Sequence, residues 1–195
     1  MAADPVTLAP LRPNPLELAP FRPEFAAPVS KWIQDEREAF WLAPRTRPPI
    51  DARKVVEWAG PGIQQLILFD GASHIPVAYG EVNRLAGHER TYWLGHLLVD
   101  PARRGLGVGR ALTERLLRYA FARLNARRVT LVVFPENAVA IACYRAAGLH
   151  LDGHESHFFP NCESTVRMVR MAVMAGDWSR STRSERDAPG RMPEP

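Results

Sequence analysis

The sequence predicts an α/β fold in which a mixed, mostly antiparallel sheet carries helices on both faces. The first observation is an apolar strand over 90–99, an amphipathic helix to residue 124 and a β-branched strand over 128–133. This order describes a βαβ crossover, so the two strands should run parallel with a right-handed connection. The second observation is a hairpin that joins strands 64–70 and 76–82 through an Asp-Gly turn. Antiparallel strands around one parallel crossover give a three-layer domain.

The other elements follow from local start and stop signals. Pro23 suits the first turn of a helix, Asp51 and Asn137 suit N-caps, and Gly148 suits a helix C-terminus. In 108–124, apolar side chains recur every three or four residues, which indicates one buried helix face. Helices are therefore expected over 23–33, 35–41, 51–58, 108–124 and 137–147, and further strands over 16–18, 149–158 and 166–173.

Length and composition predict one domain with a substantial core. The chain has 195 residues, of which 46% are hydrophobic and 24% charged. No segment approaches the roughly 20 apolar residues of a membrane span, and the N-terminus lacks the pattern of a secretory signal. We expect a flexible, Ala/Pro-rich leader over 1–14, a folded domain over 15–175 and a disordered, polar tail over 176–195.

Cysteine content and charge narrow the functional classes. The two cysteines, Cys143 and Cys162, argue against a disulfide scaffold and favour a cytoplasmic location. The net charge of +4 is mild and suits a polyanionic cofactor at least as well as nucleic acid. Nucleic-acid binding through the arginines stays a weak third hypothesis, because no basic block or aromatic-basic ribbon is present.

The stretch 100–112, DPARRGLGVGRAL, has the chemistry of a phosphate-binding loop. Gly105, Gly107 and Gly109 allow positive φ, so successive backbone N–H groups can converge on an anion at a helix start. The loop is not a nucleotide-triphosphate loop, because no GK[ST] follows, and its G-x-G-x-G spacing differs from the dinucleotide fingerprint. A plain turn before a surface helix is the structural alternative.

Two motifs together resemble the GNAT superfamily of N-acetyltransferases. Arg104–Gly109 matches the R/Q-x-x-G-x-G/A motif of that family, and Pro135–Leu149, PENAVAIACYRAAGL, resembles its second motif. The resemblance extends over about 16–173 in element order and is specific over 92–149. It implies a GNAT-like three-layer fold with splayed parallel strands, acetyl-CoA as acyl-donor cosubstrate, and an acceptor site partly built by the first helices.

The resemblance also implies which residues bind the cofactor. Backbone groups on the strand before the loop would pair with the pantetheine arm, and an N–H near Leu98 would polarise the thioester carbonyl. The loop would hold the pyrophosphate, and Asn137 either bonds the pantetheine or simply caps its helix. The implied cofactor-binding residues are Leu97, Leu98, Val99, Arg103, Arg104, Gly105, Leu106, Gly107, Val108, Gly109, Arg110 and Asn137.

Acetyl transfer to an amine needs a general acid and a general base. Tyr144 matches the family tyrosine seven residues after Asn137, so the resemblance makes it the acid that protonates the departing thiolate. The glutamate that many relatives carry before the second motif is missing from VTLVVF. His96 and Glu81 remain as candidate bases, and each could instead be a structural polar residue.

Other polar and aromatic residues have weaker functional interpretations. Cys143 adjoins Tyr144, but no histidine partner is evident, so we expect no acyl-enzyme. His154, Glu155 and His157 favour a polar loop, and no metal site is expected. The aromatic residues of the first helices favour core packing over substrate contact, namely Trp32, Phe40, Trp41 and Trp58.

The leading hypothesis is therefore an acetyl-CoA-dependent N-acetyltransferase in which a primary amine attacks directly in a ternary complex. The alternative is a non-catalytic acyl-CoA-binding regulatory or interaction domain. The acceptor could be a small molecule or a protein or peptide amine, and a homodimer is possible; neither nucleic acid nor a membrane is an expected partner.

Overall fold

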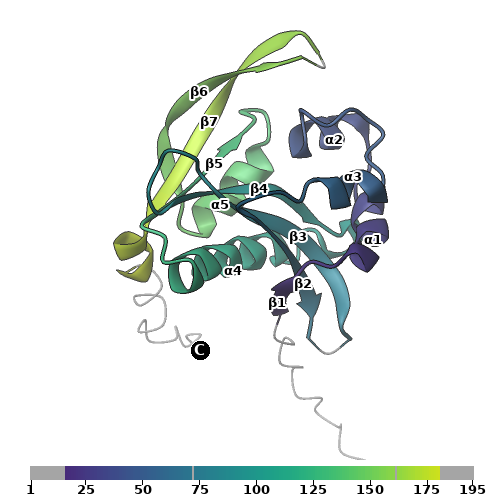
Figure 1. The fold of residues 1–195 in the computed structure, drawn as a ribbon, viewed down its shortest axis with the longest axis horizontal. Helices are drawn as coiled ribbons and strands as arrows, with labels where there is room; N and C mark the ends of the chain where they lie inside the picture. Colours follow the sequence, from purple (N-terminus) through teal and green to yellow (C-terminus); the bar gives the residue numbers. More distant parts are fainter. Residues whose placement is uncertain (1–15, 72, 161, 181–195) are drawn as a thin grey trace, which may run out of the picture.

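The computed structural model describes residues 16–71, 73–160 and 162–180. Seven strands form one sheet in the order β1-β2-β3-β4-β5-β7-β6, and only β4 and β5 are parallel (Figure 1). This confirms the predicted mixed sheet with one parallel crossover. The strands are β1 (Leu16–Pro20), β2 (Ile63–Asp70), β3 (Ile75–Arg84), β4 (Thr91–Val99), β5 (Arg128–Val133), β6 (His150–Phe159) and β7 (Ser164–Met174).

Helices cover both faces of the sheet, as predicted. One face packs against α4 (Val108–Arg123) and α5 (Ala138–Ala146), through a core that includes Leu112, Leu116 and Leu149. The other face packs against a 3₁₀ turn, η1 (Pro23–Phe25), and against α1 (Ala26–Lys31), α2 (Glu36–Leu42) and α3 (Ala52–Glu57). In this second core the helices contact Ile67 of β2, Tyr79 of β3 and Leu98 of β4.

The helix starts are set by short acidic side chains. Asp35 accepts a hydrogen bond from the Glu38 N–H at the start of α2, and Asp51 accepts one from the Lys54 N–H at the start of α3. Such caps satisfy backbone donors that have no partner inside the helix. The segment 43–51 between them contains Pro44, Pro48 and Pro49, which cannot continue a helix.

The parallel strands part soon after they meet. Their register pairs only Thr91–Trp93 with Arg128–Thr130, so the second half of β4 has no hydrogen-bonding neighbour on its β5 side. This confirms the splay implied by the family resemblance. The opening lies directly before the loop that enters α4, because β4 ends at Val99 and a 3₁₀ turn, η2 (Pro101–Arg103), follows.

The chain ends differ from the prediction at one boundary. Residues 175–180 are helical and continue the ordered chain beyond 175 (Figure 1). Trp178 is buried, and its ring lies 5.5 Å from that of Phe121 on α4 and against Gly148. The expected disorder of 176–180 is therefore wrong, because a buried indole fixes this segment. The leader 1–14 and residues 181–195 lie outside the described residues, and no described helix has the length and apolar character of a membrane span.

Candidate active site

The glycine loop has the backbone that an anion cradle needs. Gly105 and Gly107 have φ of +75° and +79°, and Gly107 is the N-cap of α4. Gly109 does not have the positive φ that the sequence allowed, because it lies in the first turn of α4. A Cβ at either position would meet nothing within 4 Å, so glycine is required there by its conformation and not by crowding. The first N–H groups of the 16-residue α4 have no partner within the helix and face the loop. These residues fit a diphosphate.

The arginines of the loop are partly engaged by the protein itself. Arg104 forms an ion pair with Glu38 of α2 and donates to the carbonyl oxygen of Trp32 at 3.0 Å. Arg103 lies 3.6 Å from Asp70, and Arg110 pairs with Glu114 at 2.6 Å. Arg104 therefore ties the glycine loop to α1 and α2, a role that the motif alone does not indicate.

A β-bulge in β4 shapes the strand that precedes the loop. Tyr79 pairs with Leu98 and Glu81 pairs with Gly95, so His96 and Leu97 together oppose the single residue Gly80. The bulge lies beyond the last β4–β5 pair, at the edge that the splay exposes. Backbone groups of Leu97, Leu98 and Val99 thus lie along the strand opening, where the cofactor arm was predicted.

Glu81 is at the centre of a buried polar network. Its side chain is 1% exposed, and Oε1 accepts a hydrogen bond from the Tyr79 hydroxyl at 2.7 Å. Oε2 accepts one from Asn83 Nδ2 at 3.2 Å, and Gln65 Nε2 donates to the Tyr79 oxygen at 2.8 Å. Burial, followed by the charge of Glu81, raises the pKa of Tyr79 far above its ordinary value, so the phenol stays a donor.

His96 connects this network to the surface. Its Nδ1 is buried and lies 2.9 Å from Glu81 Oε1, in an ion-pair contact and not an aligned hydrogen bond. The side chain as a whole is 20% exposed. Its ring stacks on that of Trp58 at 4.1 Å, and Trp58 Nε1 donates to Thr46 Oγ1 at 3.0 Å. A φ of +48° is uncommon for histidine and belongs to the bulge.

The second motif forms α5 as expected. Asn137 Oδ1 accepts from the Ala140 N–H at 3.1 Å, which is the capping geometry. Tyr144 is packed against the α4 core, and burial, followed by the neighbouring Cys143, raises its pKa. The Tyr144 hydroxyl makes no hydrogen bond to the described residues. Burial also raises the pKa of the Cys143 thiol, which lies against α4 near Gly109.

The aromatic residues of the first helices pack in hydrophobic clusters, as expected. Trp32 is 7% exposed and belongs to the core, as expected. Phe40 and Trp41 pack against a smaller hydrophobic cluster. The Phe40 ring centroid lies 4.9 Å from that of Phe134, which follows β5, and 5.6 Å from that of Phe159, at the end of β6. On this same face of β5, Val132 remains 37% exposed although its strand lies inside the sheet.

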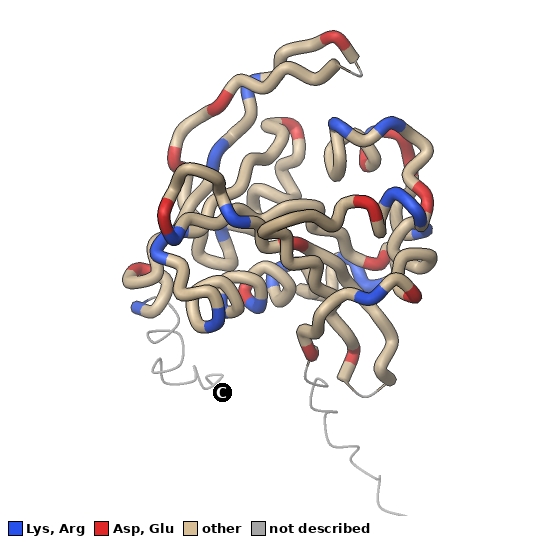
Figure 2. The backbone as a smooth tube through the Cα atoms, in the orientation of Figure 1, with Lys and Arg blue, Asp and Glu red and all other residues tan. Residues whose placement is uncertain are grey.

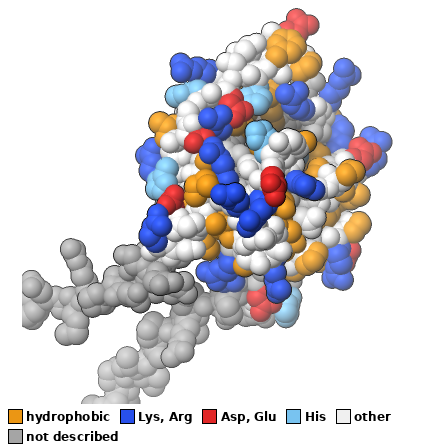
Figure 3. All heavy atoms as spheres, turned by 60° about the vertical axis from the view of Figure 1, so that its left-hand side comes forward, with side chains coloured by type: hydrophobic (Ala, Val, Ile, Leu, Met, Phe, Trp, Pro, Cys, Tyr) orange, Lys and Arg blue, Asp and Glu red, His pale blue; other side chains and the backbone are white. Residues whose placement is uncertain are grey.

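The histidine and acidic residues of β6 form an ion network. Glu155 lies 3.1 Å from His157 and 3.0 Å from Arg170, and Asp152 pairs with Arg128 and Arg170. Burial acts to raise the pKa of Glu155, but hydrogen bonds from Arg170 and His157 outweigh burial, so the pKa lies below its ordinary value. Figure 3 shows basic, acidic and histidine side chains intermingled on this side of the molecule. No group of three metal-binding side chains occurs in the described part of the chain.

A separate hollow of about 460 Å³ lies between α1, α2 and the following loop. Its lining includes Gln34, Ala39 and Ile50 but none of the predicted site residues. It therefore adds nothing to the chemistry around His96.

Sequence reasoning missed Tyr79, Asn83 and Trp58 as partners of the two candidate bases. A signal was present, because polar side chains at 79, 81 and 83 alternate along an otherwise apolar strand. Such alternation places all three on one face, which the structure confirms for Tyr79, Glu81 and Asn83. No comparable sequence signal places Trp58 on His96.

The chain has clear matches among known proteins. The model of the family described as "Acetyltransferase (GNAT) family" matches residues 24–149. An uncharacterized protein of Mycobacterium leprae is 34% identical over 96 residues, which cover 48% of this chain and 25% of that protein. The match thus spans about a quarter of the length of that relative.

Solved structures share the fold at low sequence identity. The spermidine N-acetyltransferase of Vibrio cholerae, solved with CoA and spermine, has a TM-score of 0.70 at 19% identity, covering 84% of this chain and 98% of its own. AAC(6')-Ib, solved with ribostamycin and coenzyme A, has a TM-score of 0.68 at 18% identity, covering 85% of this chain and 97% of its own. These likenesses establish the architecture.

Proposed function

We propose that this chain, which belongs to the GNAT acetyltransferase family, is an acetyl-CoA-dependent N-acetyltransferase in which His96 and Tyr144 move the protons of the reaction. Acetyl-CoA supplies the acetyl group as an activated thioester. The glycine loop would hold its diphosphate, and the free edge of β4 at Leu97–Val99 would hold its pantetheine arm. When the acetyl donor and the acceptor amine are both held in place, the reaction loses much of its entropic barrier. Well-aligned reactants can save roughly 7–11 kcal/mol of the activation free energy.

The contact between His96 Nδ1 and the buried Glu81 carboxylate carries the assignment of the base. Glu81 is 1% exposed, so it does not reach an acceptor amine directly. His96 is partly exposed, and because Nδ1 is buried, the accessible part of the ring includes its Nε2 side. His96 is therefore the base that accepts the proton of the amine, and Glu81 is a positioning residue that stabilises the imidazolium formed.

Tyr144 donates the proton that the departing thiolate gains. Its raised pKa keeps the phenol protonated at neutral pH, and its hydroxyl makes no hydrogen bond to the described residues that would hold the proton back. The amine attacks directly, without a cysteine acyl-enzyme, because burial raises the pKa of Cys143 and disfavours its thiolate.

The test is transfer itself, measured on a panel of amines that includes small metabolites, polyamines and peptides. Release of the CoA thiol is followed together with a mass increase of one acetyl group on the amine. A thermal-shift control reports cofactor binding, since saturation at 100 Kd stabilises by about 2.7 kcal/mol. We expect binding and transfer, with initial-rate lines that intersect as in a ternary complex. Binding with no transfer to any amine class would instead favour a non-catalytic acyl-CoA-binding domain.

A further inference from the structure

We propose that the acceptor is an amine that also carries an anionic group, and that Arg45 and Arg47 recognise this group at the mouth of the site. The inference rests on the proposed function, because it assumes that the amine is bound at His96. It narrows the acceptor class from any primary amine to one with a carboxylate or phosphate.

The segment between α2 and α3 that carries both arginines is fixed in place. Lys54 Nζ donates to the carbonyl oxygens of Arg47 and Pro49, each at 2.7 Å. The Thr46 N–H donates to the Ala43 carbonyl at 2.9 Å, and Ala43 and Ile50 are buried at either end. The arginine side chains therefore project from a preorganised backbone, which lowers the entropic cost of binding a ligand.

The segment lies next to the candidate base. Thr46 stands between the two arginines and accepts the hydrogen bond of Trp58 Nε1 at 3.0 Å, and the Trp58 ring stacks on His96 at 4.1 Å. His96 therefore lies against the face of the Trp58 ring, and the segment that carries both arginines lies at the Nε1 edge of the same ring.

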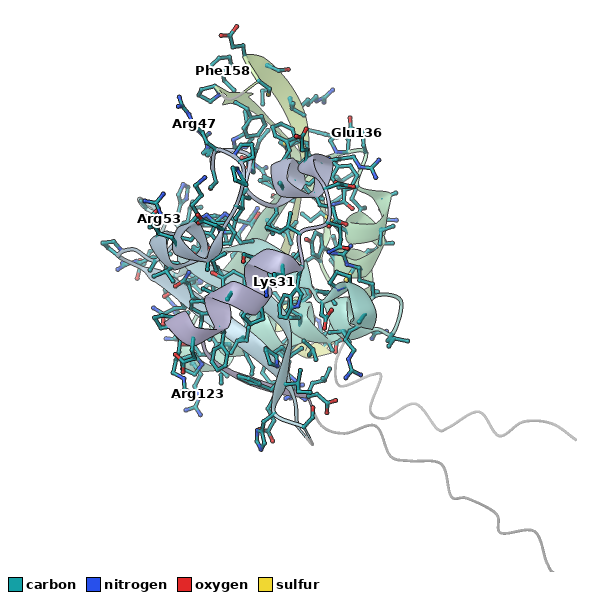
Figure 4. The ribbon with its side chains drawn as sticks, turned by 90° about the vertical axis from the view of Figure 1, so that its right-hand side faces the viewer. Lys31, Arg47, Arg53, Arg123, Glu136 and Phe158 are labelled. Atoms are coloured by element: carbon teal, nitrogen blue, oxygen red, sulfur yellow. The ribbon has the colours of Figure 1, made fainter. Side chains whose placement is uncertain are left out.

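The same segment also contacts the β6–β7 hairpin. The Arg45 guanidinium lies 5.8 Å from the ring centroid of Phe159 on the β6–β7 hairpin. Arg47 and Phe158 lie at the same end of the molecule (Figure 4). Arg45 thus contacts the hairpin, while its neighbour Thr46 contacts Trp58.

The charge at this mouth is positive and uncompensated. Both arginine residues are exposed, and neither forms an ion pair with a described carboxylate. Figure 2 shows basic positions along the α2–α3 segment. The acidic residues nearby are already used, since Asp51 caps α3, and Glu155 is shared by Arg170 and His157. A polyamine would meet like charges here, whereas a carboxylate or phosphate would find arginine donors in fork geometry.

The experiment compares amines of matched size and different charge. One set is 4-aminobutanoate, its amide and 1,4-diaminobutane, and the other is the C-terminally amidated dipeptides Ala-Glu, Ala-Gln and Ala-Lys. The two sets separate small-molecule from peptide acceptors. For the wild-type protein we expect kcat/KM to fall from anion to neutral to cation in at least one set. The anion should exceed the neutral amide roughly tenfold, the effect of about one charged hydrogen bond.

Charge reversal provides the decisive comparison. Arg45→Glu and Arg47→Glu should reverse the order and favour the cationic member, while the KM for acetyl-CoA stays unchanged. Arg123→Glu, on an exposed residue in the last turn of α4, is the matched control and should keep the wild-type order.

The outcomes separate this inference from the proposed function. If wild-type acetylates the three members of each set equally, and Arg45→Glu does the same, the inference is wrong and the transferase assignment stands. If CoA binds but no amine is acetylated, both the acceptor inference and the transferase assignment are wrong.

Discussion

Replacing Glu81 by glutamine tests whether Glu81 acts as a positioning residue for His96, which is the proposed base. Glutamine has the same shape, so it can keep the bond from Tyr79 at 2.7 Å while losing the negative charge 2.9 Å from His96 Nδ1. As the imidazolium forms, the contact with His96 Nδ1 would become a hydrogen bond between charged groups. Such a bond contributes about 1.5–3 kcal/mol, which corresponds to a loss of about 10- to 150-fold in kcat/KM. Asn83, whose Oδ1 has no partner among the described residues, can turn its amide to accept a hydrogen bond from the introduced glutamine, so stability should change little.

The assay is thiol release at saturating acetyl-CoA, with the Tm measured in the presence and absence of CoA. We expect the loss in kcat, an unchanged CoA-induced shift in Tm, and a fall of less than about 1 kcal/mol in the free energy of unfolding. A Glu81→Gln protein with kcat within twofold of wild-type would refute the positioning role. Glu81 would then be a structural residue of the buried network.

Three further predictions concern the acid, the loop and the chain end. Tyr144→Phe should lower kcat without weakening CoA binding. Because burial raises the Tyr144 pKa, the kcat of the wild-type protein should not fall between pH 8 and pH 10 through ionisation of this group. A fall in that range that disappears in Tyr144→Phe would contradict the assignment. Gly107→Ala and the control Gly87→Ala both force a side chain into positive φ and should each cost about 1–2 kcal/mol of stability, but only Gly107→Ala should weaken CoA binding in calorimetry. Trp178→Ala should lower the free energy of unfolding by about 3 kcal/mol and the Tm by roughly 6–12 °C. A Tm within 2 °C of wild-type would mean that the folded domain ends at residue 175.

Local chemistry explains why much of the fold could be predicted. The crossover of strand, helix and strand depends on apolar periodicity and has a fixed hand, and β5 occupies the predicted residues 128–133. The glycine loop could be predicted because positive φ at Gly105 and Gly107 is a property of those residues alone. Trp178 was missed because a single indole in a polar segment gives no periodic signal.

The active site depends on register, which the sequence does not reveal. Leu94 and Leu97 contact the α4 core, whereas Leu98 packs with α1–α3. In a regular strand His96 would share the α4 face with Leu94, and it would then lie on the opposite side of the sheet from Glu81. The bulge at His96 and Leu97 turns His96 to the face of Glu81. Both residues could be named as candidate bases, but their pairing required the bulge.

Substitution of His96 by glutamine is the most direct test of the central claim. The measurement is kcat for amine acetylation at saturating acetyl-CoA, beside the CoA dissociation constant from calorimetry. We expect kcat to fall by about 10²-fold or more, because general base catalysis is lost, while CoA affinity stays within twofold. A His96→Gln protein that acetylates its amine at the wild-type rate would contradict the account.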